Sequence, residues 1–499
     1  MLHLAQVLTR PGVGSAAERR AAARVRHHAA MCLAVAVSEA PLGRLGAFRQ
    51  GIYDAFSARR DALFELLDAL LTAGAVPSPV HLSLAPTHRR GHGSLYAALA
   101  RGEVSAVAVE RLLAAQPLPL AEDAVPLYAV DGSVWARCDA ETSPERGFYH
   151  HPSRHSNGQP IVAGWLYQWV AQVRLTTDSW TAPVSVDRVP PGVNLNRAAV
   201  DQIRRVVARR PADGLCPLFL FDAGYDPVQL ALELGLSRGA ANVAIVVRLR
   251  SGRCFYADPP RYGGTGRPRR HGQKFTCAAP ATWWAPTDEH TTDDPAYGHV
   301  RVRAWAGVHG KVEAHAGRGT HGPTPIERGT LLLLQVERLP RQTRAPKDVW
   351  LWWQGPPGAA PDLSMVWRAY LHRFDLEHTF RFAKETLRWT APRVRHPAQA
   401  DRWTALVVLG YTQLRLAQPL VADQRLPWER PLRQERLTPG RVRRQFSQLR
   451  ALVGTPARPP QPCGHLTTRP TGLRYRPVPR YPTIKLTAPP DGEALRAVA

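Results

Sequence analysis

The sequence predicts an α/β protein with a strand-rich core, and three observations support this class. From about residue 121 to residue 250, strand patterns are followed by alternating strand and helix patterns. Two short apolar runs in that region each end at an aspartate. Later in the chain, residues 370–384 carry a stripe of charged side chains at helical spacing.

Residues 1–120 are rich in alanine and predict a helical N-terminal domain. Within it, Gly51–Ala73 carries apolar side chains at helical spacing, which predicts one amphipathic core helix. Two shorter helices are expected at 94–101 and 105–116. The basic segment His88–His92 before them is open to two interpretations, a contact with DNA or an exposed loop.

From residue 121 to residue 250 the expected elements follow the order of a ribonuclease-H-like domain. Short β-rich runs predict the strands, and apolar residues three and four apart predict the helices between them. In chain order these are strands at 125–130, 161–175 and 181–189, a helix at 194–210, a strand at 217–221, a helix at 227–234 and a strand at 242–249. The fold class predicted for this region is an α/β ribonuclease-H-like core.

Two aspartates follow buried strands of this core. The run 125–130 stops at Asp131, and the run 217–221 stops at Asp222. An aspartate after a strand is commonly a turn former or a helix cap, so neither residue alone indicates a site. Binding sites of open α/β sheets lie at such carboxyl ends, and a third acid on a later helix favours the functional interpretation.

That third acid lies in the charged stripe. The stripe consists of Tyr370, Arg373, Glu377 and Lys384. At about 100° per helical residue the four positions fall in one narrow sector, so a single helix would present them along one edge. A carboxylate flanked by cations is suited to holding a metal ion beside a polyanionic backbone.

The interval from Asp222 to Glu377 is too long for one connection in a compact domain. A β-rich insertion domain is therefore expected at 251–360, beginning with the Gly/Arg/Pro loop Arg261–Lys274. The second part of the core, with the Glu377 helix, is expected at 361–416. The strand candidates of the insertion are 299–305, 330–336 and 348–353.

Residues 417–499 form a basic C-terminal region rich in proline and arginine. Thr438 and Pro439 provide a helix start and Gly454 a helix stop, so a helix is expected between them. The arginines of that helix are candidates for contact with DNA or a partner protein. The tail from Thr455 onward is expected to be extended or disordered.

The amino-acid composition indicates which class of partner the protein binds and in which cellular compartment it works. Lys and Arg total 65 against 40 Asp and Glu, a formal charge of +25, which favours a polyanionic partner, foremost nucleic acid. The six cysteines are dispersed, which disfavours a zinc ribbon or a disulfide framework and suits a reducing cytoplasm. No apolar stretch approaches the ~20 residues of a transmembrane helix, so no membrane partner is expected.

The residue types and spacing of the charged stripe resemble the Y-R-E-K signature of bacterial insertion-sequence transposases in the DDE superfamily. The chain is similar to family four of these elements, or to its family-seven-hundred-and-one offshoot, over about residues 121–415 and not at the termini. The resemblance implies a ribonuclease-H-like core interrupted by a β-strand insertion domain, with Asp131, Asp222 and Glu377 as catalytic and metal-binding acids. Carboxylate ligands favour two Mg²⁺ ions, with Mn²⁺ as a substitute.

The remaining residues of the stripe are expected to contact DNA. Arg373 is expected to bind the scissile or an adjacent phosphate, Lys384 a flanking phosphate, and Tyr370 the same backbone. In some relatives a tryptophan of the insertion domain stacks on a flipped base, although core packing is the alternative for each candidate. The tryptophans of this region are Trp283, Trp284, Trp305, Trp350, Trp352 and Trp353.

A histidine-rich loop offers a second cluster. It contains Arg154 and His155, which are expected to contact the substrate DNA. Three histidines also invite a zinc interpretation, with His150, His151 and His155 as ligands. That interpretation is disfavoured because Pro152 and the irregular spacing give no i, i+4 pair.

These observations predict a DDE transposase that catalyses metal-dependent cleavage at transposon ends and strand transfer into target DNA. Its expected partners are double-stranded DNA, comprising terminal inverted repeats and target DNA, and a second copy of the chain in a homodimer on DNA. Its expected location is the bacterial cytoplasm, in association with the nucleoid. Two alternatives remain: a non-catalytic DNA-binding regulator derived from a transposase, and a stand-alone ribonuclease-H-like nuclease.

Overall fold

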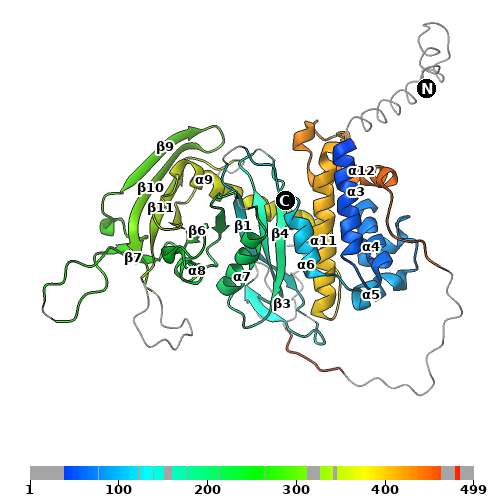
Figure 1. The fold of residues 1–499 in the computed structure, drawn as a ribbon, viewed down its shortest axis with the longest axis horizontal. Helices are drawn as coiled ribbons and strands as arrows, with labels where there is room; N and C mark the ends of the chain where they lie inside the picture. Colours follow the sequence, from blue (N-terminus) through cyan, green and yellow to red (C-terminus); the bar gives the residue numbers. More distant parts are fainter. Residues whose placement is uncertain are drawn as a thin grey trace, which may run out of the picture.

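The computed structural model is a mixed α/β molecule in which helices flank one large sheet (Figure 1). The structure describes residues 39–76, 78–121, 124–138, 140–150, 160–176, 178–211, 213–264, 266–311, 326–340, 345–461 and 478–483. Within these ranges, no helix is both long and apolar enough to cross a membrane.

In the described residues the sheet has twelve strands, and β1 (Leu127–Ala136) lies third along the path β2-β3-β1-β5-β6-β12-β11-β10-β7-β8. β1 pairs antiparallel with β3 (Ile161–Val173) and parallel with β5 (Leu218–Phe221). β6 (Ala244–Leu249) continues the parallel ladder beyond β5. The order β4-β3-β1-β5-β6 is consistent with a ribonuclease-H-like core. The other strands are β2 (Gly147–His150), β4 (Ala182–Val189), β7 (Cys254–Tyr256), β8 (Lys274–Thr276), β9 (Asp288–Asp294), β10 (Gly298–His309), β11 (Arg328–Val336) and β12 (Val349–Gln354).

The strands between residues 251 and 360 extend the same sheet. β12 pairs antiparallel with β6, the last strand of the parallel ladder, and β11 and β10 follow outward from β12. The segment is therefore β-rich, and its strands are hydrogen-bonded to the core sheet. The two short strands β7 and β8 lie at the outer end of this extension.

Both faces of the sheet are covered by helices. Successive residues of a strand point to opposite faces, so Ala129 contributes to one hydrophobic core and Val130 to the other. α7 (Leu195–Ala208) and α8 (Pro227–Leu234) cover the face of Val130. The side chain of Asn194 accepts backbone hydrogen bonds at the start of α7 and caps that helix.

The N-terminal helices form one bundle with the last two long helices of the chain (Figure 1). Arg49 and Asp68 form a buried ion pair of 2.8 Å inside this bundle, and Arg450 donates a 3.2 Å hydrogen bond to the same carboxylate. Segments far apart in sequence therefore share one core. The helices are α3 (Glu39–Asp54), α4 (Arg60–Thr72), α5 (His92–Arg101), α6 (Ala106–Ala114), α11 (Pro397–Ala417) and α12 (Pro439–Val453).

Two segments expected as single helices are each divided. The pattern over 51–73 predicted one helix, but the chain breaks between α3 and α4, where Arg59 is left-handed with a φ of 55°. The charged stripe is divided between α9 (Leu363–His372) and α10 (Phe374–Glu385), so the prediction of one helix is wrong. Arg373 lies at the junction, where i→i−3 backbone hydrogen bonds tighten the turn.

The arginines outside the core that were candidates for DNA contact bind other parts of the protein instead. Arg443 donates to the backbone carbonyls of Leu70 and Ala73 near the end of α4. The other arginines of this group form ion pairs with acids of the protein. These ion pairs account for the positions of the arginines, so no contact with DNA is needed to explain them. The pairs are Arg441–Asp423 (2.7 Å), Arg444–Glu429 (2.6 Å), Arg450–Asp68 (3.2 Å), Arg89–Glu65 (2.8 Å) and Arg90–Glu65 (2.5 Å).

Candidate active site

Asp131 and Asp222 lie together at the end of the parallel ladder between β1 and β5. The last pair of that ladder is Val130 with Phe221, and each residue directly precedes one of the aspartates. β5 ends at Phe221, as the sequence predicted. β1 does not end before Asp131 but continues to Ala136, because these residues stay paired with β3. The expected strand end at Asp131 is therefore wrong, although the parallel pairing does stop there.

Backbone amides fix one oxygen of each aspartate. Asp131 Oδ1 accepts a hydrogen bond of 2.7 Å from the backbone N–H of Gly132. Asp222 Oδ1 accepts one of 2.9 Å from the backbone N–H of Gly224. These bonds orient both carboxylates at the point where β1 and β5 separate.

Arg373 connects Asp131 to the glutamate of α10. Its Nη1 donates to Asp131 Oδ2 at 2.9 Å, and its Nη2 donates to Glu377 Oε1 at 3.2 Å. The Arg373 side chain is 3% exposed, whereas the Glu377 side chain is 48% exposed. Arg373 was expected to bind a phosphate, but in this structure its guanidinium faces the acids. Glu377 thus approaches Asp131 from the face of the sheet that packs against α9 and α10, opposite the face of Val130.

The carboxyl group of Asp131 lies where a negative charge is unfavourable. Burial is the largest cause, and it raises the pKa of Asp131 from 3.8 to about 6. The charges of Asp222 and Glu377 also raise this pKa, and Arg373 acts against them. Asp222 and Glu377 are therefore both near enough to Asp131 to disfavour its ionised form.

The chemistry of the three acids fits a hard divalent cation. Carboxylate oxygens are the ligands that Mg²⁺ and Mn²⁺ prefer, and a cation beside Asp131 would relieve the charge crowding that raises its pKa. In the described part of the chain, no three His, Cys, Asp or Glu side chains are close enough to hold a metal ion. The Arg373 guanidinium, bonded to Asp131 and Glu377, supplies positive charge between the acids.

Lys384 and Tyr370 flank the acids from α10 and α9. Burial lowers the pKa of the Lys384 amine, and the charge of Asp131 opposes that shift. Lys384 makes no hydrogen bond or ion pair with the described residues, so its charge is not neutralised by a direct partner among them. Tyr370 is 2% exposed and lies beside Arg373, so its phenol is not on the surface in this state.

Tyr225 is a site residue that the sequence did not single out. Burial raises the pKa of its phenol, and the charges of Asp131 and Asp222 raise it further. The Tyr225 hydroxyl is buried and has no hydrogen-bond partner among the described residues. The only signal in the sequence was its position three residues after Asp222, which carried no chemical argument by itself.

Several other expected site residues lie elsewhere or outside the described ranges. Arg154 and His155 lie outside the described residues, as do two of the three histidines considered for zinc. Trp283 is partly buried and stacks on Phe275 with ring centroids 5.9 Å apart. Core packing describes the buried tryptophans of the insertion. These are Trp305, Trp350, Trp352 and Trp353.

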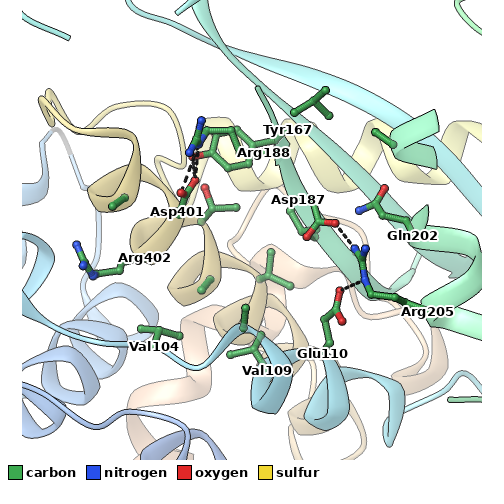
Figure 2. Close-up of a pocket in the computed structure, with 18 of the residues that line it drawn as sticks. Val104, Val109, Glu110, Tyr167, Asp187, Arg188, Gln202, Arg205, Asp401 and Arg402 are labelled. Atoms are coloured by element: carbon green, nitrogen blue, oxygen red, sulfur yellow. Dashed lines mark hydrogen bonds and ion pairs between the residues drawn. The ribbon is translucent and has the colours of Figure 1, made fainter. Parts of the chain in front are cut away.

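A cavity of about 610 Å³ lies away from these acids, between α6, α7, α11 and β4. Figure 2 shows two groups of its charged side chains that pair with one another. Arg188 Nε lies 3.1 Å from Asp401, and Arg205 binds both Glu110 and Asp187. None of the three candidate acids lines this cavity. The cavity therefore does not compete with the carboxylate cluster as the active site.

Comparison with known families identifies the family of the chain. A family described as DDE superfamily endonuclease matches residues 51–311, more than half of the chain. The matched region contains Asp131 and Asp222 and ends before Glu377. No curated protein matches the chain. The match and the geometry lead to one conclusion, that this chain belongs to the family of DDE superfamily endonucleases.

Proposed function

We propose that the protein is a DDE transposase of the Y-R-E-K type, which cuts transposon ends and joins them to target DNA. The family membership supports an endonuclease acting on DNA. The observation that carries the finer proposal is the bridge from Arg373 to Asp131 and Glu377, because it joins the Y-R-E-K stripe to the strand acids. The formal charge of +25 supports a polyanionic substrate.

The three acids are proposed to hold the divalent ions after a rearrangement that brings them closer, because no three such side chains of the described residues are near enough to hold a metal ion in this structure. Asp131, Asp222 and Glu377 would supply the carboxylate ligands of these ions. Bound Mg²⁺ or Mn²⁺ would supply Lewis acidity for activating the attacking hydroxyl and for stabilising the leaving oxygen. The protein's own contribution is to fix one acid on β1, a second directly after β5 and a third on α10.

Arg373 and Lys384 are proposed to act on different partners. Arg373 is buried and bonded to two acids, so we assign it first to positioning Asp131 and Glu377 in the DNA-free protein. Arg373 could bind a phosphate, as expected, only after its hydrogen bond to Asp131 or to Glu377 has broken. Lys384 is a half-buried cation without such a partner, and we assign it to a phosphate beside the reacting one.

We propose that the active species is a homodimer on paired DNA ends. Strand transfer joins two ends to one target, so two active centres must be held at a fixed spacing. The chain's net charge opposes pairing of free protomers until phosphates neutralise it. The basic regions His88–His92 and Arg441–Arg450 are occupied largely by internal ion pairs.

The test is an assay of end cleavage and joining with Mg²⁺ or Mn²⁺. The substrate is a duplex that carries the imperfect inverted repeats flanking the reading frame in its native DNA. Asp131→Asn, Asp222→Asn and Glu377→Gln should each lower cleavage on the order of 10³-fold or more, with DNA binding retained. Asp201→Asn, which removes an exposed acid of α7, is the matched control.

The alternatives give different results in the same assay. Cleavage without joining would identify a stand-alone nuclease, and DNA binding without either reaction would identify a regulator. Variants of the three acids that cleave like the wild type would overturn the assignment of the site. Loss of both binding and cleavage would indicate misfolding, which thermal unfolding of each variant would reveal.

A further inference from the structure

A basic arm projects from the outer end of the sheet, between β7 and β8 (Figure 1). The arm comprises residues 259–274, of which 259–264 and 266–274 are described. It contains no aspartate or glutamate. Its cations, all exposed, are Arg261, Arg267, Arg269, Arg270 and Lys274.

The base of the arm is a closed hairpin. β7 pairs antiparallel with β8, and the pairing continues beyond the strands through Ala257. Ala257 N–H donates to Gln273 at 3.0 Å, and Gly272 N–H donates to Ala257 at 2.9 Å. The two sides are so close that a side chain at Gly272 would run into the carbonyl oxygen of Asp258. The arm therefore leaves the sheet in a defined direction.

Two side-chain contacts anchor the base to neighbouring strands. His271 Nδ1 lies 2.9 Å from Nε2 of His309 on β10, a residue that is fully buried. Burial lowers the pKa of both imidazoles, so near neutral pH one uncharged ring donates to the other. Asp258, the acid closest to the arm in sequence, is bonded to Arg328 on β11 at 3.0 Å.

The arginines nearer the tip have no such partners. Arg261, Arg267 and Arg269 make no hydrogen bond or ion pair with the described residues. This distinguishes them from the arginines of α12, which bind carboxylates and carbonyl groups. Tyr262, which is 55% exposed, donates from its hydroxyl to Gly266 at 2.6 Å and closes the tip. The arm thus presents several unneutralised cations on a structured support.

We propose that the basic arm binds the phosphates of duplex DNA that extends beyond the catalytic acids; this rests on the proposed function. Hydrogen-bonded neighbours lead from β5 through β6, β12, β11 and β10 to β7. At about 4.8 Å per step, the arm begins roughly 24 Å from β5, the strand that Asp222 directly follows. A duplex rises about 3.4 Å per base pair, so the contact lies about seven or more base pairs from the reaction. Arginine–phosphate contacts of this kind carry no sequence preference.

The experiment compares two triple variants that lower the net charge equally. Arg261→Ala/Arg267→Ala/Arg269→Ala removes the arm's cations, and Arg204→Ala/Arg301→Ala/Arg338→Ala removes arginines bonded to protein oxygens. Both are made in full-length Asp222→Asn protein, so that cleavage does not enter the measurement. Fluorescence anisotropy gives the affinity for mixed-sequence duplexes of about 6 and about 30 base pairs, between about 50 and about 200 mM salt.

On the long duplex, the arm variant should lower the log–log salt slope by about two to three units, as for three lost phosphate contacts. On the short duplex its slope should match that of its parent. The control variant should leave both slopes unchanged. Circular dichroism should show that both variants fold.

An arm variant whose slope on the long duplex is unchanged would overturn the proposal. An equal loss in the control variant would also overturn it, because the effect would then come from net charge alone. An equal loss on single-stranded DNA would overturn the assignment to a duplex. The proposed transposase activity is judged separately by cleavage and joining with the wild-type chain, so its failure would leave the anisotropy result standing.

Discussion

The guanidinium of Arg373 donates to Asp131 across 242 residues of sequence, from the point where α9 gives way to α10. The same guanidinium binds Glu377 one turn later. A single buried cation therefore sets the position of a strand acid relative to a helix acid. The junction between the two helices matters because it directs the Arg373 side chain into the sheet rather than toward solvent.

Replacing Arg373 by Met should destabilise the protein by about 3 kcal/mol, because Asp131 would be left buried without its cation. Urea denaturation followed by fluorescence measures the change. The double variant Arg373→Met/Asp131→Asn should recover part of the loss, since the uncompensated charge is then absent. Equal stability of Arg373→Met and the wild type would show that the bridge does not contribute to folding.

Metal binding should weaken as the pH falls below about 6, the raised pKa of Asp131. The folded chain binds more protons than the unfolded chain between pH 3.8 and about 6, so ionising Asp131 costs stability as the pH rises through this window. A bound divalent ion offsets that cost only where the carboxylate is ionised. Mn²⁺ should therefore raise Tm at about pH 7.5 and not at about pH 5. In Asp131→Asn, an undiminished Mn²⁺ effect would contradict the assignment.

Lys384→Gln should weaken DNA binding modestly and flatten the log–log salt dependence by about one unit, as for one lost phosphate contact. The reason is that Lys384 is a cation near Asp131 without a direct partner among the described residues. The measurement is anisotropy with transposon-end DNA over a range of salt concentrations. Lys347→Gln, an exposed lysine before β12, is the control. Equal salt slopes for Lys384→Gln and the wild type would show that Lys384 does not contact a phosphate.

Arg443→Ala should lower the free energy of unfolding by about 2 kcal/mol and leave the salt slope of DNA binding unchanged. Arg443 donates to backbone carbonyls at the end of α4, so its loss leaves these acceptors without a charged donor. Denaturant unfolding and anisotropy measure the two properties. Arg433→Ala removes an exposed arginine and should change stability by less than about 0.5 kcal/mol. A flattened salt slope in Arg443→Ala would instead restore α12 as a DNA contact.

The protein should be mainly monomeric alone and form a two-protomer complex with end DNA. The charge of +25 disfavours association until phosphates neutralise it. Light scattering at moderate salt, with and without end DNA, measures both states. A complex with one protomer that still joins both ends would exclude the dimer.

The sequence predicted most elements of the core and placed Asp131 and Asp222 correctly beside each other, because apolar runs and their ends are local signals. It missed the continuation of β1 past Asp131, which depends on pairing with β3. It also missed the break at Arg373, since the stripe has helical spacing on both sides of the junction. Tyr225 carries no local pattern, and its place beside the acids depends on the tertiary fold.

The functions of the basic segments were harder to predict for a related reason. A run of arginines has the same appearance in sequence whether its partner is DNA or a distant part of the protein. Arg443 and its acceptor Leu70 are 373 residues apart, so no local signal marks their contact. The arm between β7 and β8 differs in structure, because three of its arginines have no partner among the described residues.

The shared core of the first and last helices has a consequence for the order in which the chain can fold during synthesis. α3 and α4 are made early, but the helices that cover them, α11 and α12, are made last. Until α12 has left the ribosome, Asp68 lacks the cation of Arg450 and the bundle lacks part of its apolar cover. The strand-rich core can acquire its sheet before then. The N-terminal bundle is not complete until both α11 and α12 have been made, so a chain that stops before α12 would leave it incomplete.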